Sequence, residues 1–190
     1  MNTNVKLVGS GGGLAYSTLG STHQAVEDVA LMRTIPNMTI LCPCDAYDVS
    51  EALKMAAAKE GPVYIRMPRQ PREVMAKERR LELGKAEILK DGKDIAIFAT
   101  GPMVEEALFA AEILKNNGID AAVLGFMTVK PLDENAVKNK SYSDCGRTFS
   151  NRRIRKRRRA VACRHVGLAA GIYYGHSGGR EGNRALQRAA

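Results

Sequence analysis

The stretch MTILCPCDAYDVSEALKMAAAKEGPVYIRM, residues 38–67, decides the fold, because its pattern predicts a strand, a helix and a second strand. Residues 38–42 form a short apolar run between prolines, which is typical of a buried strand. Asp45 is placed as the N-cap of an alanine-rich helix that ends at Glu60-Gly61-Pro62. Residues 63–67 are then the next strand.

Apolar side chains recur at helical spacing just before this stretch. They predict a helix over residues 24–34, and Pro36 stops it. The order helix, strand, helix, strand indicates an α/β unit. Residues 71–84 carry many charges and little periodicity, and we interpret them as a linker.

A second unit follows the linker. Two apolar runs between residues 86 and 100 flank Asp91-Gly92, a hairpin-type turn signal. An amphipathic helix opens at Gly101-Pro102 and ends at Asn117-Gly118, and residues 121–126 predict another strand. Strand, helix and strand in this order imply a parallel pair. We therefore expect an α/β fold of two small parallel-sheet units with a basic irregular tail.

The net charge of +9 comes from the end of the chain. Residues 147–190 carry 12 lysines and arginines against one acid, Glu181, whereas residues 1–146 carry 17 against 19 acids. A pI near 9.6 would suggest a nucleic-acid partner for a uniformly basic protein. Because most of this chain is mildly acidic, we do not expect it to bind nucleic acid.

The sequence contains no candidate membrane span and no secretory signal. No stretch approaches the roughly 20 consecutive apolar residues of a span, and residues 1–4 lack a basic and apolar signal pattern. We therefore expect a cytoplasmic location and no membrane partner. The cysteines indicate neither a zinc ribbon nor a disulfide framework, and we expect buried or reduced thiols; they are Cys42, Cys44, Cys145 and Cys163.

The glycine-rich loop Gly11-Gly12-Gly13 precedes the first predicted helix, and His23 lies next to that helix. Such a loop lets a ligand approach the backbone and presents N–H groups to an anion, and an imidazole can carry protons near neutral pH. Arg66 and Arg69 follow the second strand, where open parallel sheets bind ligands, and suit a phosphate or carboxylate. The alternatives are a capping or packing histidine and an ion-paired strand end. Asp133-Glu134 indicates the acidic first turn of a helix.

Five segments resemble the transketolase family. Three are similar to its pyrimidine-binding domain and two to the start of its C-terminal domain: LGSTHQAVEDVALMR (19–33), IPNM (35–38), GPVYIR (61–66), ATGPMV (99–104) and VKPLD (129–133). The resemblance covers residues 5–138. Glu27 fits transketolases better than the related deoxyxylulose-phosphate synthases.

The resemblance implies a thiamine-diphosphate enzyme that moves a two-carbon ketol unit between sugar phosphates. His23 matches the family's Thr-His-Gln histidine and is assigned a catalytic role. Arg69 matches the arginine that holds the substrate phosphate, and Arg66 is assigned to substrate binding with it. Cofactor binding is assigned to Gly11, Gly12 and Gly13.

Two features of the family are missing from the matching positions. Gly11 and Leu19 stand where many transketolases have an active-site His and Asp, so the substrate is left open. The family's diphosphate- and magnesium-binding domain lies N-terminal to this region. So does its cofactor-activating glutamate, which even a full C-terminal subunit should contain and which is not present here. We assign no metal ligand here and expect magnesium to come from a missing domain or partner subunit. The chain is expected to form a homodimer or a complex with a transketolase N-terminal subunit, and to have no transketolase activity alone.

The resemblance divides the chain into four segments: a partial pyrimidine-binding domain at 1–70, a linker at 71–84, a partial C-terminal domain at 85–140 and a basic tail at 141–190. One permitted set of codons for residues 151–158, AAT AGA AGA ATA CGG AAG CGG AGG, gives Ile-Glu-Glu-Tyr-Gly-Ser-Gly-Gly when read one nucleotide later. That is close to the family's continuation, so a frameshift is one hypothesis. The alternative is a catalytically inactive α/β partner module with a nucleic-acid-binding arm, since arginine-rich runs neutralise phosphates.

Overall fold

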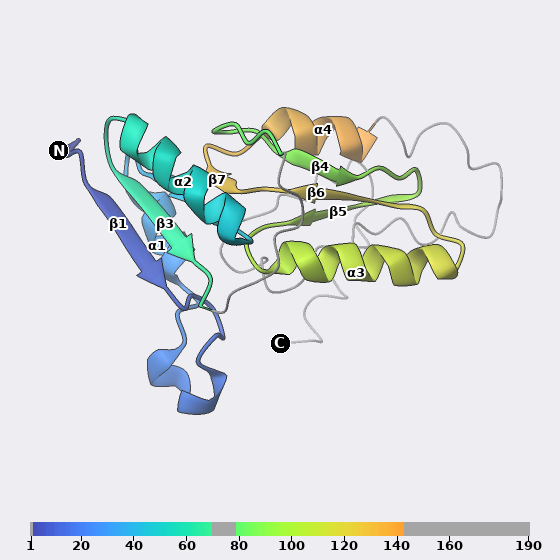
Figure 1. Ribbon diagram of the computed structural model, residues 1–190, viewed down its shortest axis with the longest axis horizontal. Coiled ribbons are helices and arrows are strands. Elements are labelled where there is room, and N and C mark those ends of the chain that lie inside the picture. The colour runs from blue at the N-terminus through green and yellow to red at the C-terminus, as the bar shows by residue number, and fades with distance from the viewer. Residues whose placement is uncertain (1, 70–78, 143–190) are drawn as a thin grey trace, which may run out of the picture.

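The computed structural model describes residues 2–69 and 79–142. The basic tail and its proposed frameshift lie outside these residues, as do Cys145 and Cys163. In chain order the elements in Figure 1 are β1 (Lys6–Ser10), two 3₁₀ turns (Ser17–Leu19 and Ser21–His23), α1 (Asp28–Thr34), β2 (Thr39–Leu41), α2 (Ala46–Ala58), β3 (Val63–Met67), β4 (Glu87–Lys90), β5 (Ile95–Ala99), α3 (Met103–Asn116), β6 (Ala121–Gly125), β7 (Thr128–Lys130) and α4 (Glu134–Tyr142).

The first sheet has the strand order β1-β3-β2-β7. β1 and β2 both run parallel to β3, and Val63 of β3 lies opposite Lys6 on one side and Thr39 on the other. β7 pairs antiparallel with β2 at the far edge. This strand comes from the part of the chain beyond the linker, so the later residues complete the first sheet.

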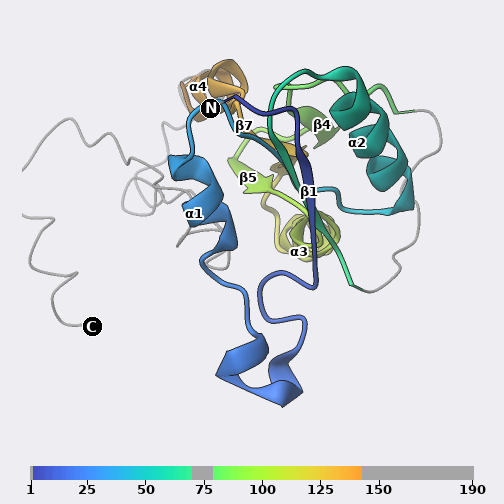
Figure 2. The same ribbon diagram turned by 90° about the vertical axis from the view of Figure 1, so that its left-hand side faces the viewer.

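Side-chain alternation along β2 and β3 places α1 and α2 on opposite faces of the first sheet, as Figure 2 shows. Ile40 and Tyr64 pack on the α1 side, while Leu41 and Ile65 pack on the α2 side. Asp45 caps α2 by accepting the backbone N–H of Asp48 at 2.8 Å, as predicted.

The second sheet has the order β4-β6-β5, with β5 parallel and β4 antiparallel to the central strand β6. Val123 faces α3, and Leu124 faces the opposite side, where α4 packs. Asp133 opens α4 by accepting the N–H of Ala136 at 3.0 Å, which confirms its place in a first helical turn. Both sheets are therefore mixed, and the predicted α/β class is confirmed.

The hairpin expected at Asp91-Gly92 does not form, because β6 lies between β4 and β5. Gly92 instead has another role: a Cβ there would overlap the backbone of Ala121 and Ala122. The glycine thus allows a loop to lie against β6. A turn signal and a close backbone approach use the same residue type, and the sequence does not distinguish them.

One predicted boundary needs adjustment, and two strands were not predicted. α1 begins at Asp28 and not at Gln24, because Gln24 is extended and Ala25 forms a backbone bridge with Gly13. β1 was not predicted because its apolar residues Leu7 and Val8 are adjacent and give no alternating pattern; they are 41% and 53% exposed. β7 has three residues, which is too short for a periodic signal.

Arg79 ties the two units together in the part of the chain that the structure describes. Its guanidinium pairs with Asp48, with Asp45 at 3.1 Å and with Glu87 of β4 at 3.2 Å. Its side chain is only 7% exposed. No helix among the described residues is long and apolar enough to cross a membrane.

Candidate functional site

The loop that joins β1 to α1 projects beyond the carboxyl ends of β1 and β3 (Figures 1 and 2). Ligands bind at this end of open α/β sheets. Two backbone hydrogen bonds close the neck of the loop: Gly13 donates to Ala25 at 2.7 Å, and Ala25 donates to Gly13 at 3.1 Å. The residues between them form a loop with a fixed base.

The three glycines let this loop turn and pack closely. Gly11 and Gly13 have φ of +74° and +72°, which favour glycine. A Cβ on Gly12 would overlap the Arg66 guanidinium. The N–H of Gly11 donates to Met67 at 3.3 Å, and that of Gly13 donates to Ala25. These two N–H groups are therefore used within the chain itself.

Arg66 lies beneath the glycine loop and is paired with Asp28 of α1. Its Nε and Nη2 donate to the two carboxylate oxygens at 2.8 and 3.1 Å, and Nη2 also donates to Ala25 at 3.1 Å. The Tyr64 hydroxyl donates to Asp28 at 2.8 Å. Burial opposes ionisation of Asp28, but its hydrogen bonds to Arg66 and Tyr64 keep the pKa of the carboxyl below its usual value. Burial and the Asp28 carboxylate raise the pKa of Tyr64.

The Tyr16 ring lies beside both His23, on the same loop, and Arg69, which follows β3. The Arg69 guanidinium lies over the Tyr16 ring, 4.0 Å from its centroid, and the His23 ring lies 6.3 Å from Tyr16 between centroids. Arg69 also donates to the carbonyl of Ala15 at 3.5 Å. His23 Nδ1 lies 3.0 Å from the Thr22 hydroxyl, and both His23 and Arg69 are exposed. A cation and an imidazole therefore share one exposed surface.

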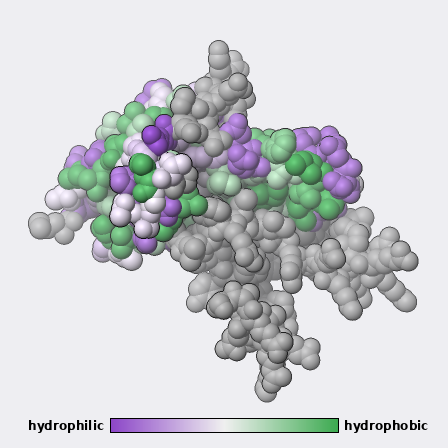
Figure 3. All heavy atoms as spheres, turned by 90° about the horizontal axis from the view of Figure 1, so that it is seen from below, coloured by the Kyte–Doolittle hydropathy of each residue, from purple (hydrophilic) through white to green (hydrophobic). Residues whose placement is uncertain are grey.

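The surface around these residues is partly apolar. Figure 3 looks up at the molecule from the side of the loop and shows hydrophobic patches among polar ones. Leu14, Leu19 and Val26 are each between 44% and 54% exposed there. The loop thus combines polar groups suited to a charged ligand with apolar surface.

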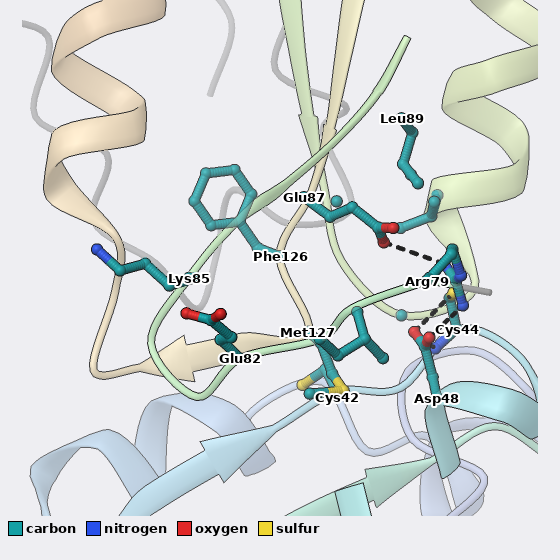
Figure 4. A pocket seen from close by; sticks show the side chains of 14 residues that line it. Cys42, Cys44, Asp48, Arg79, Glu82, Lys85, Glu87, Leu89, Phe126 and Met127 are labelled. Carbon is teal, nitrogen blue, oxygen red and sulfur yellow. Dashed lines mark hydrogen bonds and ion pairs between the residues drawn. The ribbon is translucent and has the colours of Figure 1, made fainter. Parts of the chain in front are cut away.

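A second polar cluster surrounds Arg79 (Figure 4), and His23 is not among the residues that line its cavity. Cys44, Asp45 and Asp48 lie close enough together to resemble a metal site, but Arg79 pairs with both carboxylates. The adjoining cavity measures about 10 Å³, which is too small for a substrate. This cluster is a buried ion-pair network that joins the units.

Both described cysteines border this cavity and carry free, buried thiols, as predicted. Burial raises the pKa of Cys42 to about 12. Burial also raises the pKa of Cys44, and so does its hydrogen bond to Asp48 at 2.8 Å. Neither thiol is suited to act as a nucleophile.

Among the residues predicted for the site, the structure brings His23 and Arg69 to one surface and leaves Arg66 beneath it, bound to Asp28. Sequence reasoning missed Tyr16 and Asp28. Tyr16 follows the glycine run directly, but a single aromatic residue in a loop carries no positional signal. Asp28 looked like an ordinary acidic residue in a helix.

Two family models, two relatives and a solved structure that match this chain are all described as transketolases or parts of them. The family described as the transketolase pyrimidine binding domain matches residues 1–73, and the transketolase C-terminal domain matches residues 84–149. A Methanocaldococcus jannaschii protein named as a transketolase C-terminal section is 45% identical over 138 residues, covering 71% of this chain and 44% of the relative. A 6-deoxy-6-sulfo-D-fructose transketolase subunit of a Clostridium species is 47% identical over 135 residues, covering 70% and 42%.

A solved structure titled as a split gene transketolase, inactive beta4 tetramer, is 40% identical and has a TM-score of 0.66. The match covers 74% of this chain and 45% of that one. The chain thus spans less than half the length of these relatives. Its two matched domains and its fold show that it belongs to the transketolase family and matches part of the family's C-terminal section.

Proposed function

We propose that this chain is part of a thiamine-diphosphate-dependent transferase that moves a two-carbon ketol unit between sugar phosphates. The observation that carries this proposal is the meeting of His23 and Arg69 on Tyr16, at the carboxyl ends of two parallel strands. A proton carrier beside a cation suits a reaction at one end of a substrate whose other end is anionic.

His23 is the group we propose to move a proton. With Nδ1 beside the Thr22 hydroxyl, Nε2 is the nitrogen that we propose to exchange a proton with the substrate. Exposure on the loop leaves the ring accessible to a substrate. The Thr22 contact engages Nδ1 and leaves Nε2 as the nitrogen available for proton transfer.

Arg69 is the group we propose to bind the anionic end of the substrate. Its exposed guanidinium can make two charge-assisted hydrogen bonds to a phosphate. The name of the Clostridium relative specifies a sulfo sugar, and a sulfonate would suit the same guanidinium. Arg66 has its guanidinium engaged by Asp28, so we propose that it contributes by supporting the glycine loop.

The described residues fit only one side of a thiamine-diphosphate site. The N–H groups of Gly11 and Gly13 already have acceptors within the chain, and Arg79 occupies the one described cluster of possible metal ligands. We therefore propose that a partner subunit holds the diphosphate and its magnesium, while this chain contributes the glycine loop and His23. When bound, thiamine diphosphate supplies the carbanion chemistry.

Reconstitution tests this proposal. The full chain, thiamine diphosphate and Mg²⁺ are assayed for ketol transfer from a ketose phosphate to an aldose phosphate, with and without a transketolase N-terminal subunit. We expect no turnover by the chain alone, because the N–H groups of Gly11 and Gly13 are already used and Arg79 pairs with the described metal-ligand cluster. Turnover with the N-terminal subunit requires that the added protein also supply the cofactor-activating glutamate. A cytoplasmic location is part of the proposal, since sugar phosphates are the substrates.

Two outcomes would contradict different parts of it. Turnover by the chain alone would show that the cofactor site does not need a partner. Binding to the N-terminal subunit without any turnover, with thiamine diphosphate present, would favour an inactive partner module.

A further inference from the structure

We propose that Tyr16 is a positioning residue that holds Arg69 in register with His23, and that Gly11 is required because it leaves room for the Tyr16 ring. This inference rests on the proposed function, since it assigns how the anion-binding arginine of that site is oriented. The evidence for it is the set of contacts that the half-buried Tyr16 ring makes with Arg69 and His23.

Arg69 depends on Tyr16 for its position. The side chain is exposed, and among the described residues it contacts the Tyr16 ring, at 4.0 Å from the centroid, and the Ala15 carbonyl, through a long 3.5 Å hydrogen bond. An unrestrained exposed arginine samples many rotamers, and ordering it costs entropy when a ligand binds. The aromatic face lowers this cost by stacking the planar guanidinium in one place before the ligand arrives.

The Tyr16 ring also lies next to the His23 ring. The two ring planes are tilted by 55° with centroids 6.3 Å apart, so Tyr16 contacts the arginine with its face and lies beside the imidazole. His23 follows on the same loop, whereas Arg69 comes after β3. Tyr16 is thus the described side chain that links the two segments of the site.

Gly11 determines whether Tyr16 can lie there. A Cβ at position 11 would overlap the Tyr16 ring, so any side chain at this position displaces the ring. Gly20 lies in the same loop and also has a positive φ, +77° against +74°, but a Cβ on it would meet nothing within 4 Å. Alanine at either position is strained by the positive φ, and of the two only alanine at position 11 also meets Tyr16.

These relationships give four matched variants of the full chain. Tyr16→Leu removes the aromatic face, Tyr16→Phe keeps it without the hydroxyl, Gly11→Ala displaces the ring, and Gly20→Ala controls for backbone strain. Proton NMR of the Arg69 side chain, assigned by its loss in Arg69→Lys, reports the stacking through the ring-current shift. Titration with inorganic phosphate, followed at the same Arg69 signal, measures the affinity without a contribution from the basic tail.

We expect Tyr16→Leu and Gly11→Ala to lose the ring-current shift and to bind phosphate about two- to fivefold more weakly, the factor that an exposed cation–π contact corresponds to. Tyr16→Phe and Gly20→Ala should retain both. If Tyr16→Leu loses the shift but binds phosphate as the wild type does, the positioning role is wrong and the proposed anion site stands. If phosphate leaves the wild-type Arg69 signal unmoved, the anion site itself is wrong.

Discussion

Arg66 and Asp28 form a two-point ion pair between β3 and α1, with nitrogen to oxygen distances of 2.8 and 3.1 Å. The pair lies directly beneath Gly12, so it forms the floor of the glycine loop. Neither residue is fully buried, since the side chains of Arg66 and Asp28 are 25% and 15% exposed. The pair therefore remains sensitive to pH and to substitution.

Replacing Asp28 with asparagine should lower the free energy of unfolding by about 2 kcal/mol at pH 7, the scale of hydrogen bonds to a charged group. The folded pKa of Asp28 lies below the unfolded value of 3.8, so the stabilisation is complete above that pH and is lost as the pH falls through the folded pKa. Urea unfolding should therefore show a constant difference between wild type and Asp28→Asn from pH 5 to 8, and a smaller one at pH 3. Glu27→Gln, at the adjacent exposed acid, is the control and should change little. A difference independent of pH would contradict the role of the charge.

Replacing Arg79 with methionine should destabilise the protein by about 3–5 kcal/mol, because it leaves the buried Asp45 and Asp48 without their cation. Arg80→Met is the matched control, since the neighbouring Arg80 is 91% exposed and pairs only at the surface with Glu82. Denaturant unfolding of the two variants measures the difference. Equal stability would show that the network around Arg79 does not hold the two units together.

Cys42 and Cys44 should resist alkylation in the folded chain at pH 8. Both thiols are buried, and burial raises their pKa values, that of Cys42 to about 12, so little thiolate forms. Peptide mass mapping after treatment with iodoacetamide separates these two sites from Cys145 and Cys163. In denaturant all four should react. Rapid labelling of Cys42 in the native chain would mean that the junction of the two units opens readily.

Substitutions at His23 and Arg69 should affect different kinetic constants of the enzyme reconstituted with an N-terminal subunit. Loss of a proton carrier typically lowers the rate by about 10²–10⁴, so His23→Ala should reduce kcat. Arg69→Ala should mainly raise KM for phosphorylated substrates and have little effect with unphosphorylated ones. If both variants raise KM alone, His23 binds substrate and does not transfer protons.

The DNA that encodes residues 147–190 should contain, in the frame one nucleotide later, codons for two consecutive glutamates followed by a glycine-rich segment. We expect this because the charge changes abruptly along the chain. Residues 147–190 carry 12 basic residues and one acid, whereas the preceding sequence is mildly acidic. Sequencing the gene checks this. If no shifted frame restores that pattern, the arginine-rich segment belongs to the protein, and salt-dependent binding to duplex DNA becomes the test of its role.

Local sequence patterns predicted the helices and strands in which buried and exposed side chains follow a regular pattern along the chain. β3 was placed at residues 63–67 with its observed bounds, and α2 was located through its Asp45 cap. The strands that escaped prediction lack that regularity, because β1 is half exposed and β7 is short. The pairing of β4 with β6 instead of β5 depends on contacts distant in sequence, which a local turn signal does not contain.

The site was predicted less completely than the fold. Resemblance pointed to His23 and Arg69, whose side chains lie on the same loop surface. It gave no reason to connect them through Tyr16, or to connect Arg66 with Asp28, 38 residues away along the chain. Both relationships arise from how a loop folds back over a strand end, and residue identity alone does not specify that geometry.

The position of β7 has a consequence for any attempt to express the two matched domains separately. Thr128–Lys130 belongs by sequence to the second domain, yet it covers the edge of β2 in the first sheet. A truncation between the two matched regions would expose the backbone of β2, a surface on which other chains can add strands. A soluble first domain would therefore need this strand supplied in trans or fused back as a short peptide, even though the domain boundary in the sequence falls elsewhere.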